Sequence, residues 1–504
     1  MLNDNHPVAA VGSADFVARH GLWTDGQRAA AAALDAELNS LDFVRVVFGD
    51  PHGIARSKTV TAAGFRTILR NGMDFSPGPF VFDTGHAVAV DFFAEGGGIG
   101  VGELTGAGDF IVVPDPLTFR VLPHTGRRTG WVIGDEHTRA GAPHPLSSRA
   151  VLRAQCERLA QRDLDFMVGL EVEWYLTRFT DGGRAGAIGG FGAQGRPPAV
   201  EAVNGGYQFN SDTLLDGVLP VIEPVIDALL ALGLPLRSIE HESGPGQLEF
   251  TFNPLTGVAA ADAMLLFRTV TKQVLSRSGH HASFMALPGL PGFDPSGWHL
   301  HQSLAHRSGG ANAFAAATAD EVLSDLGMHY LGGLLAHAAE ASLLCVPTVN
   351  GYRRMQDTFS LSPDRIGWCT ENRGAFLRVV GGGGDPAGHI ENRSGEPTAN
   401  PYLYLAGQLS AGLDGVDRAL EPGSPLKDPH APVVLALPRT LTEAIAAFTE
   451  SSHYCGTLGA ALHECLLRLK TSEQARFAQW RAEADPAPED QTTEWEHREY
   501  FATY

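Results

Sequence analysis

Carboxylates and histidines recur at alternate positions of short apolar segments, and this alternation restricts the fold more than any other feature of the chain. In residues 170–176, Glu171 and Glu173 stand two positions apart. A β-strand puts such a pair on one face, whereas a helix with about 3.6 residues per turn would separate them by roughly 200°. Residues 247–252 repeat the pattern around Glu249. We therefore expect a sheet with one apolar face and one acidic face.

Two further segments carry the same pattern, and Glu242 precedes the glycine-rich turn that leads to Glu249. The polar residues that share a face are His299, His301 and Ser303 in one segment and His389, Glu391 and Arg393 in the other. Each segment alone could be the solvated face of an amphipathic strand. A cleft with this many acids is unfavourable, however, unless cations neutralise it. Oxygen and imidazole donors without Cys favour Mg²⁺ or Mn²⁺, and such ions beside arginines predict a phosphate-handling site.

The composition disfavours several classes of partner. The net charge of −20 argues against nucleic acid and anionic membranes. The five cysteines include no CxxC pair, which is typical of reduced thiols in a cytosol. The first residues lack the order of a signal peptide, and no apolar run is long enough to span a bilayer. We expect a cytoplasmic protein that binds neither nucleic acid nor membrane.

The domain organisation is predicted from a stretch rich in Gly, Ala, Pro and His at 138–145. We expect a helical lead-in over 1–40, a small β domain over 41–140 and a large α+β domain over 141–504. Strands are predicted at 43–48 and 109–114, and helices from Ser147 or Ser148, at 260–277, at 321–345 and at 459–480.

Six sequence signatures follow one another along the chain. They are Glu171-Val-Glu173, Glu242 to Glu249 through Gly-Pro-Gly-Gln, Gly297 to Ser303, Asn372-Arg373, Glu391-Asn-Arg393, and Ala399-Asn-Pro-Tyr402. In these residues the chain resembles the bacterial glutamine synthetases over nearly its whole length. The resemblance implies an α+β fold with an N-terminal β-grasp domain and a catalytic domain whose curved antiparallel sheet is flanked by helices. It also implies an ATP-dependent carbon–nitrogen ligase that uses Mg²⁺ or Mn²⁺, and a homo-oligomer, a dodecamer of two hexameric rings with active sites between subunits.

The resemblance also implies a role for residues of each signature. One divalent ion would be held by Glu173, Glu242 and Glu249, and a second by Glu171, His299 and Glu391. The catalytic residues implied are Asp50, Arg354, Arg373 and Glu242, and Asp50 would enter a neighbouring subunit's site to help remove a proton from the amine. The residues that would bind glutamate or the amine are Arg354, Arg393, Gly297, Tyr207 and Phe359. The nucleotide contacts implied are Ser303, His301, Arg373 and Arg378.

Departures from the family pattern concern the substrate side of the site. Ammonia-using members carry a glutamate in the flap after the position of Arg354, whereas residues 355–363 contain no Glu. Phe359 and Leu361 in this flap would make the site larger or more apolar. Residues 294–296 also replace an Asn-Gly-rich turn that contacts the α-amino end of glutamate. The nucleotide side differs as well, because two basic positions of the family are occupied here by Pro386 and His389.

Three functions fit these residues. The first is a γ-glutamyl amide synthetase that couples L-glutamate to an alkyl or aryl amine, an aniline being one candidate. The second is an ammonia-dependent glutamine synthetase, in which Asp357 or Asp364 takes the place of the missing glutamate. The third is a non-catalytic relative. The presence of all six implied metal ligands argues against the third, because a binding protein has no need of a costly cluster of acids.

Overall fold

The computed structural model describes residues 15–182, 189–318, 320–356, 361–484 and 491–504. Its contacts divide the chain into two compact units. The first holds residues 1–48, 57–76 and 109–144, and the second holds residues 49–56, 77–108 and 145–504. The division differs from the predicted domains, because residues 49–56 and 77–108 belong to the second unit and not to that of the small β domain.

Hydrogen bonds to distant parts of the chain explain this grouping. Asp83 accepts a hydrogen bond from Arg476 Nε at 2.8 Å, and Thr84 Oγ1 donates to Glu499 at 2.6 Å. The carbonyl oxygen of Asp50 accepts from Asn400 Nδ2 at 3.0 Å. All these partners lie hundreds of residues further along the chain, so local boundary signals in the sequence do not reveal them.

The first unit contains a six-stranded mixed sheet in the order β2-β1-β6-β4-β3, with β5 paired to β6. Its strands are β1 (Phe43–Gly49), β2 (Ala55–Thr61), β3 (Met73–Phe75), β4 (Phe110–Pro114), β5 (Arg120–Leu122) and β6 (Thr129–His137), and its helices are α1 (Phe16–His20), α2 (Asp25–Leu38) and α3 (Ala62–Asn71). Strands β1 and β6 are parallel, while β6 is antiparallel to β4 and β5. Phe48, Phe75 and Phe110 pack ring against ring in the core. The strands predicted at 43–48 and 109–114 are confirmed as β1 and β4.

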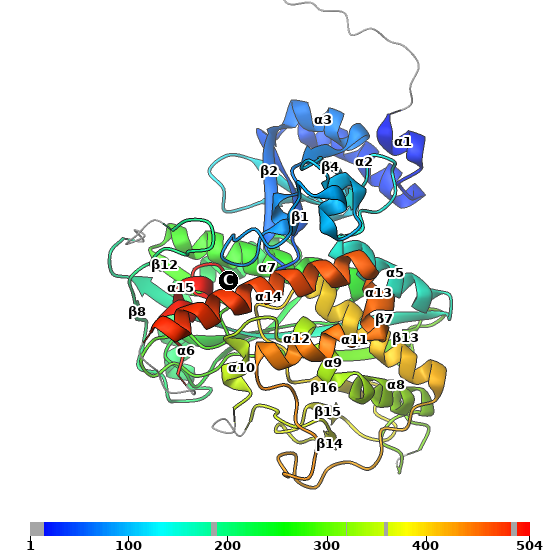
Figure 1. The fold of residues 1–504 in the computed structure, drawn as a ribbon, viewed down its shortest axis with the longest axis vertical. Helices are drawn as coiled ribbons and strands as arrows, with labels where there is room; N and C mark the ends of the chain where they lie inside the picture. Colours follow the sequence, from blue (N-terminus) through cyan, green and yellow to red (C-terminus); the bar gives the residue numbers. More distant parts are fainter. Residues whose placement is uncertain (1–14, 183–188, 319, 357–360, 485–490) are drawn as a thin grey trace, which may run out of the picture. The chain divides into compact units, whose positions relative to one another are not determined.

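The second unit is built on a ten-stranded sheet in the order β14-β15-β16-β13-β7-β10-β9, with β8, β11 and β12 also paired to β7. Figure 1 labels β7, β13, β14, β15 and β16 of this sheet. Its strands are β7 (Leu164–Phe179), β8 (Val200–Ala202), β9 (Leu236–His241), β10 (Gln247–Phe252), β11 (Leu255–Thr256), β12 (His280–Ser283), β13 (Trp298–His306), β14 (Trp368–Thr370), β15 (Leu377–Val380) and β16 (His389–Asn392). Among the described residues every pairing is antiparallel except that of β14 with β15. The predicted antiparallel sheet is therefore confirmed apart from one pair at its edge, where the three-residue β14 has no second neighbour to set its direction.

Burial alternates along β7 as the sequence predicts. Phe166, Val168 and Leu170 are buried, whereas Glu171 and Glu173 remain partly accessible. The buried face packs against α5 (Ser148–Ala160) and α7 (Gly257–Arg277). Each large apolar side chain on that face stabilises the fold by roughly 1.5–3 kcal/mol relative to an exposed position. The opposite face of β7 carries Glu171 and Glu173.

The helices of the second unit include those predicted from Ser147 or Ser148, at 260–277 and at 459–480. Besides α5 and α7 they are α4 (Gly78–Val81), α6 (Asp212–Ala231), α8 (Asp325–Ala336), α9 (Ala338–Cys345), α10 (Gly351–Arg354), α11 (Pro401–Arg418), α12 (Leu441–Thr449), α13 (Ser452–Leu458), α14 (Ala460–Glu483) and α15 (Glu494–Tyr500). Ser147 caps α5 by accepting from the amide of Ala150 at 3.2 Å, as expected. The single helix predicted over 321–345 is wrong, because α8 and α9 meet at His337, whose side chain hydrogen-bonds Asp414 at 2.8 Å. In the part of the chain that the structure describes, no helix is long and apolar enough to cross a membrane.

Helices α8 and α11 approach each other closely because glycines meet at their contact. A Cβ atom on Gly333 would lie 2.1 Å from the carbonyl oxygen of Ala411 and 2.7 Å from the nitrogen of Gly415. A Cβ atom on Gly415 would lie 2.1 Å from the carbonyl oxygen of His329. These distances are far shorter than real contacts, so the two helices can pack this way only with glycine at both positions.

We expect Gly333→Ala to destabilise the protein, because the added methyl group forces α8 and α11 apart, and overpacking of this kind costs about 1–3 kcal/mol. Gly217→Ala in α6 is the matched control. Nothing lies within 4 Å of a Cβ atom at Gly217, so alanine should stabilise that helix by about 1 kcal/mol. Urea unfolding followed by circular dichroism measures both changes. Equal stability of Gly333→Ala and the wild type would contradict the close contact.

Candidate active site

Strand register brings the predicted metal-binding acids together on one face of the sheet. In the antiparallel pair β7–β10, Glu173 stands opposite Glu249, and in the pair β9–β10, Glu240 stands opposite Glu249. In the pair β7–β13, His299 stands opposite Glu171. Cβ atoms of directly opposed residues lie about 4.5–5.5 Å apart, so the sheet holds like charges together that would separate in an unconstrained chain.

These acids line a cavity of about 620 Å³, called here the acidic cavity. Arginines line it as well. Its charged residues and its histidine are Glu171, Glu173, Glu240, Glu242, Glu249, Asp294, His299, Arg354, Arg373 and Arg393. The cavity thus combines donors for divalent cations with guanidinium groups that suit carboxylate and phosphate.

Burial and mutual repulsion disfavour the ionised forms of two of these acids. Burial, and then the charges of Glu171 and Glu173, raise the pKa of Glu249 to about 10. Burial, and then the charges of Glu173 and Glu240, raise the pKa of Glu242 to about 8. A cation between these side chains would remove the repulsion, so the electrostatics of the cluster favour divalent ions.

Hydrogen bonds have the opposite effect at Glu171. Its two oxygens accept from Nδ1 of His299 at 2.6 Å and from Nε2 of His301 at 2.9 Å. Burial alone would raise the pKa of Glu171, but these hydrogen bonds outweigh it and hold the pKa well below its usual range. At Glu391 burial likewise opposes ionisation, and the guanidinium of Arg393, which donates to this carboxylate, lowers the pKa. Both acids therefore carry negative charge at neutral pH.

Arg354 is fixed in the wall of the acidic cavity. Its guanidinium donates to the carbonyl oxygens of Ser394 at 3.1 Å and Arg393 at 2.8 Å, and Nη2 lies 3.3 Å from His299 Nε2. A Cβ atom at Gly297 would lie 2.6 Å from Nη2 of Arg354 and 2.9 Å from Nε2 of His299. Glycine is therefore required at this predicted site position, because any side chain would displace the arginine.

A second cavity, of about 640 Å³, lies on the same sheet and is called here the histidine cavity. It shares Glu171, Glu240 and Thr251 with the acidic cavity. The predicted nucleotide contacts that line it are His301, Ser303 and Arg378, whereas Arg373 lines the acidic cavity. Because three residues line both cavities, the two cavities lie next to each other on the sheet.

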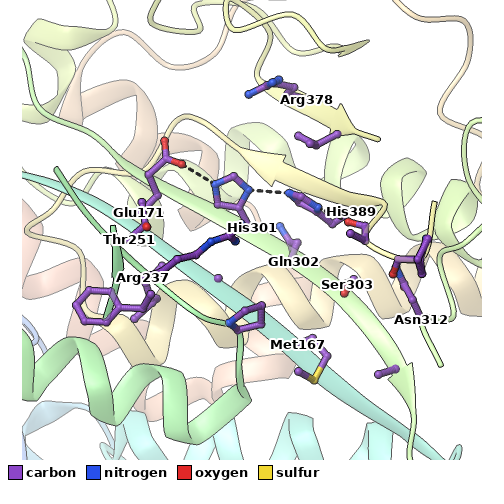
Figure 2. Close-up of a pocket in the computed structure, with 18 of the residues that line it drawn as sticks. Met167, Glu171, Arg237, Thr251, His301, Gln302, Ser303, Asn312, Arg378 and His389 are labelled. Atoms are coloured by element: carbon purple, nitrogen blue, oxygen red, sulfur yellow. Dashed lines mark hydrogen bonds and ion pairs between the residues drawn. The ribbon is translucent and has the colours of Figure 1, made fainter. Parts of the chain in front are cut away.

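Figure 2 shows a chain of hydrogen bonds through Glu171, His301 and His389 in the histidine cavity. Nδ1 of His389 donates to the carbonyl oxygen of Ala387 at 2.7 Å, and its Nε2 is hydrogen-bonded to Nδ1 of His301 at 2.8 Å. Nε2 of His301 then donates to Glu171 at 2.9 Å. The three side chains therefore form a continuous chain of hydrogen bonds beside the acids.

Around the two cavities, three groups of carboxylate and imidazole donors lie close enough to share an ion, with ligand atoms within 4.8 Å of one another. They are Glu171 with Glu249 and His299, Glu171 with His301 and Glu391, and Glu240 with Glu242 and Glu249. Glu173 is in none of these groups, and one of its oxygens accepts from the amide of Gly297 at 3.0 Å. These donor types fit Mg²⁺ or Mn²⁺.

The sequence analysis missed Glu240. This residue stands two positions before Glu242, the same alternate spacing that identified Glu171 and Glu173, so the signal was present in the sequence. Arg237 and Asn312, which line the histidine cavity, were also missed. No local pattern distinguishes these two from ordinary surface residues.

Asp50 lines neither cavity. Its carboxylate is fully buried and accepts from Nε of Arg56 at 2.7 Å and from the amides of His52 and Ile54 at 2.9 Å. In its own chain Asp50 therefore holds a turn. Its role across a subunit interface stays a prediction.

Two residues, Tyr207 and Phe359, were predicted at the amine site. The hydroxyl of Tyr207 donates to the carbonyl oxygen of Gly292 at 2.7 Å, and Tyr207 does not line the acidic cavity. Phe209, two residues further on, does line it. Phe359 lies outside the described residues.

The sequence profile of the glutamine synthetase catalytic domain matches residues 145–500. This chain belongs to the glutamine synthetase family. A γ-glutamylanilide synthase of Acinetobacter sp. is 40% identical over 497 residues, which cover 97% of this chain and 98% of that protein. A glutamine synthetase of Thermococcus kodakarensis is 31% identical over 407 residues, or 78% of this chain and 85% of that protein. A solved structure of a GmaS–ADP complex matches with a TM-score of 0.73 and 26% identity over 93% of this chain and 98% of that chain.

We expect Mg²⁺ or Mn²⁺ to raise the thermal unfolding midpoint of this glutamine synthetase family member, because a bound cation relieves the repulsion around Glu249. An ion at 100 times its Kd adds about 2.7 kcal/mol of stability. Glu249→Gln should lose most of this shift, whereas Glu37→Gln, an exposed control on α2, should keep it. Differential scanning fluorimetry with EDTA and with each ion measures the effect. An unchanged shift in Glu249→Gln would remove Glu249 from the metal site.

Proposed function

We propose that this chain is an ATP-dependent ligase that joins L-glutamate to an organic amine and forms a γ-glutamyl amide. The observation that carries the proposal is the 40% identity to a γ-glutamylanilide synthase over 97% of the chain. The acids, histidines and arginines of the two cavities supply the groups that such a reaction needs. The similarity to a glutamine synthetase at 31% identity makes ammonium the alternative acceptor.

The donors of the acidic cavity suit two divalent ions, Mg²⁺ or Mn²⁺. We assign one ion to Glu173, Glu242 and Glu249 and the other to Glu171, His299 and Glu391, and Glu240 is close enough to join the first set. Bound ions would neutralise the charge of the phosphates during phosphoryl transfer. The raised pKa values of Glu242 and Glu249 support the assignment, because these two acids are costly to ionise without a cation.

The arginines suit the carboxylate substrate and the phosphoryl group. Arg354 and Arg393 are buried at the acidic cavity and are assigned to the carboxylate of glutamate, which a guanidinium binds through paired hydrogen bonds. Arg373 is exposed in the same cavity and is assigned to the transferring phosphoryl group. His301, Ser303 and Arg378, which line the histidine cavity, are assigned to the nucleotide.

The reaction has two steps. An oxygen of the γ-carboxylate of glutamate attacks the terminal phosphorus of ATP, and the bond from that phosphorus to the bridging oxygen breaks to release ADP. The amine nitrogen then attacks the acyl carbon of the γ-glutamyl phosphate, the bond from carbon to the phosphate oxygen breaks to release phosphate, and the amine passes a proton to a base, the role that we assign to Asp50 of a neighbouring subunit. The wall shared by the two cavities, with Glu171, Glu240 and Thr251, is the position we assign to the terminal phosphate.

The flap argues for an organic amine rather than ammonium. Residues 355–363 contain no glutamate to capture a small hydrated cation, and Leu361 and Ser362 line the acidic cavity. An apolar side chain favours an amine with a hydrocarbon group, at about 25 cal/mol per Å² of buried apolar area. An aryl amine is also neutral near pH 7 and needs no prior deprotonation.

We expect an alkyl or aryl amine to exceed ammonium by at least about tenfold in kcat/KM, which is about 1.4 kcal/mol of transition-state discrimination. The measurement is phosphate release with glutamate, ATP and Mg²⁺ against ammonium, methylamine, a polyamine and aniline, with the amide identified by mass spectrometry. If ammonium is the best acceptor, the enzyme is a glutamine synthetase. If no acceptor supports phosphate release, the protein is a non-catalytic relative.

We also propose that the enzyme is a homo-oligomer, a dodecamer of two hexameric rings, with Asp50 acting in a neighbouring subunit's site. The proposal is supported by the match to the glutamine synthetase catalytic domain, since the resemblance to that family implies active sites between subunits. Asp50→Asn keeps an oxygen that can accept from the amides of the turn, and Glu249→Gln disables the metal site. Co-expressed, the two variants should regain activity that neither has alone, because some sites then combine intact copies of both residues. An active monomer in mass photometry would contradict this.

A further inference from the structure

Phe209 is a large apolar side chain that stands exposed in the acidic cavity. It is 62% exposed, and Leu361, which lines the same cavity, is 63% exposed. Pro295 is the only other apolar residue among the described residues that line this cavity. A single exposed phenylalanine is ordinary on a protein surface. A phenyl ring among five glutamates is different, because it offers nothing to the ions or phosphates that those acids serve.

The backbone on either side of this ring is anchored, and it is strained at Tyr207. Tyr207 has φ 58° and Asn210 has φ 54°, both in the left-handed region, which asparagine tolerates but a bulky residue such as tyrosine seldom adopts. The amide of Tyr207 donates to the carbonyl oxygen of Ser243 at 2.6 Å, and that of Asn210 donates to the carbonyl oxygen of His241 at 2.9 Å. The two anchors flank Glu242, so the segment is attached directly to the end of the strand that carries an acid of the site.

Further hydrogen bonds fix the start of this segment, residues 204–211. Oδ1 of Asn204 accepts from the amides of Gly206 at 3.2 Å and Gly246 at 2.9 Å. The hydroxyl of Tyr207 is held by the carbonyl oxygen of Gly292. Strain persists only where the surroundings impose it. Here the hydrogen bonds impose a conformation in which Tyr207 points to Gly292 and Phe209 lines the acidic cavity.

We infer that Phe209 is a specificity-determining residue that packs against the hydrocarbon group of the acceptor amine, and that this group is an aromatic ring. The inference rests on the proposed function and names the acceptor class. Two rings gain an offset-stacked or edge-to-face contact beyond the burial of apolar area. A ring held in place before binding loses little freedom when the acceptor arrives. A small acceptor such as ammonium or hydroxylamine has no hydrocarbon to contact and gains nothing from Phe209.

The test compares Phe209→Ala, Phe209→Leu and the matched control Phe93→Ala. Phe93 is 74% exposed and lines neither cavity. Each variant is assayed for γ-glutamyl amide formation with aniline, methylamine and hydroxylamine as acceptors. We expect Phe209→Ala to raise the KM for aniline about tenfold, while kcat with hydroxylamine changes less than about twofold. Phe209→Leu, which stays apolar, should lose less, and Phe93→Ala should match the wild type.

Other results of these assays would contradict either the role of Phe209 or the proposed function. If the wild type forms amides and Phe209→Ala leaves the ratio of aniline to hydroxylamine activity unchanged, this inference is wrong while the proposed function stands. Equal losses with all three acceptors would make Phe209 a structural support and not a specificity residue. If the wild type forms no amide with any acceptor, the proposed function itself fails. Should Phe209→Ala not fold, as judged by circular dichroism, the ratio measured for Phe209→Leu decides the question.

Discussion

The antiparallel pairing of β7 with β10 and β13 holds carboxylates together against their mutual repulsion, and the rest of the site depends on it. Glu173 and Glu249 are opposed in one ladder and Glu171 and His299 in the other. The hydrogen bonds between the strands and the burial of the apolar face of β7 stabilise the sheet and offset this repulsion between the carboxylates. Burial and this repulsion raise the pKa of Glu249, and a cation bound between the acids would remove the repulsion.

The sheet separates two tasks between its faces. One face of β7 is apolar and packs against α5 and α7, while the other lines both cavities. Around the acids the chain adds fixed groups of other chemistry. Arg354 is held by backbone carbonyl oxygens, and Phe209 is held by a strained segment with anchors on both sides of Glu242. A single cavity thereby combines carboxylates, guanidinium groups and an apolar ring, which is the combination that the proposed ligase for glutamate and an aryl amine needs.

Predictions from the sequence succeeded where a property is local. The period of two in Glu171 and Glu173 follows from strand geometry alone, and the cap at Ser147 depends on residues three positions away. Glu240 stands two positions from Glu242, the same alternate spacing as Glu171 and Glu173, but it was not predicted as a site residue. The break at His337 was unpredictable, because a hydrogen bond to Asp414 in another helix fixes it. The grouping of residues 77–108 with the second unit had the same kind of cause, in contacts such as that of Asp83 with Arg476.

The sequence by itself determined four strands of this sheet (β7, β10, β13 and β16), the acidic identity of one face and the family, because alternation and motif order are properties of neighbouring residues. Only the tertiary structure decided which acids stand opposite each other, that Glu171 serves both cavities, and that Phe209 rather than Tyr207 faces the acids. The physical reason is that register, burial and backbone strain arise from contacts between segments far apart in the chain. The residues next to a side chain in the sequence do not reveal those contacts.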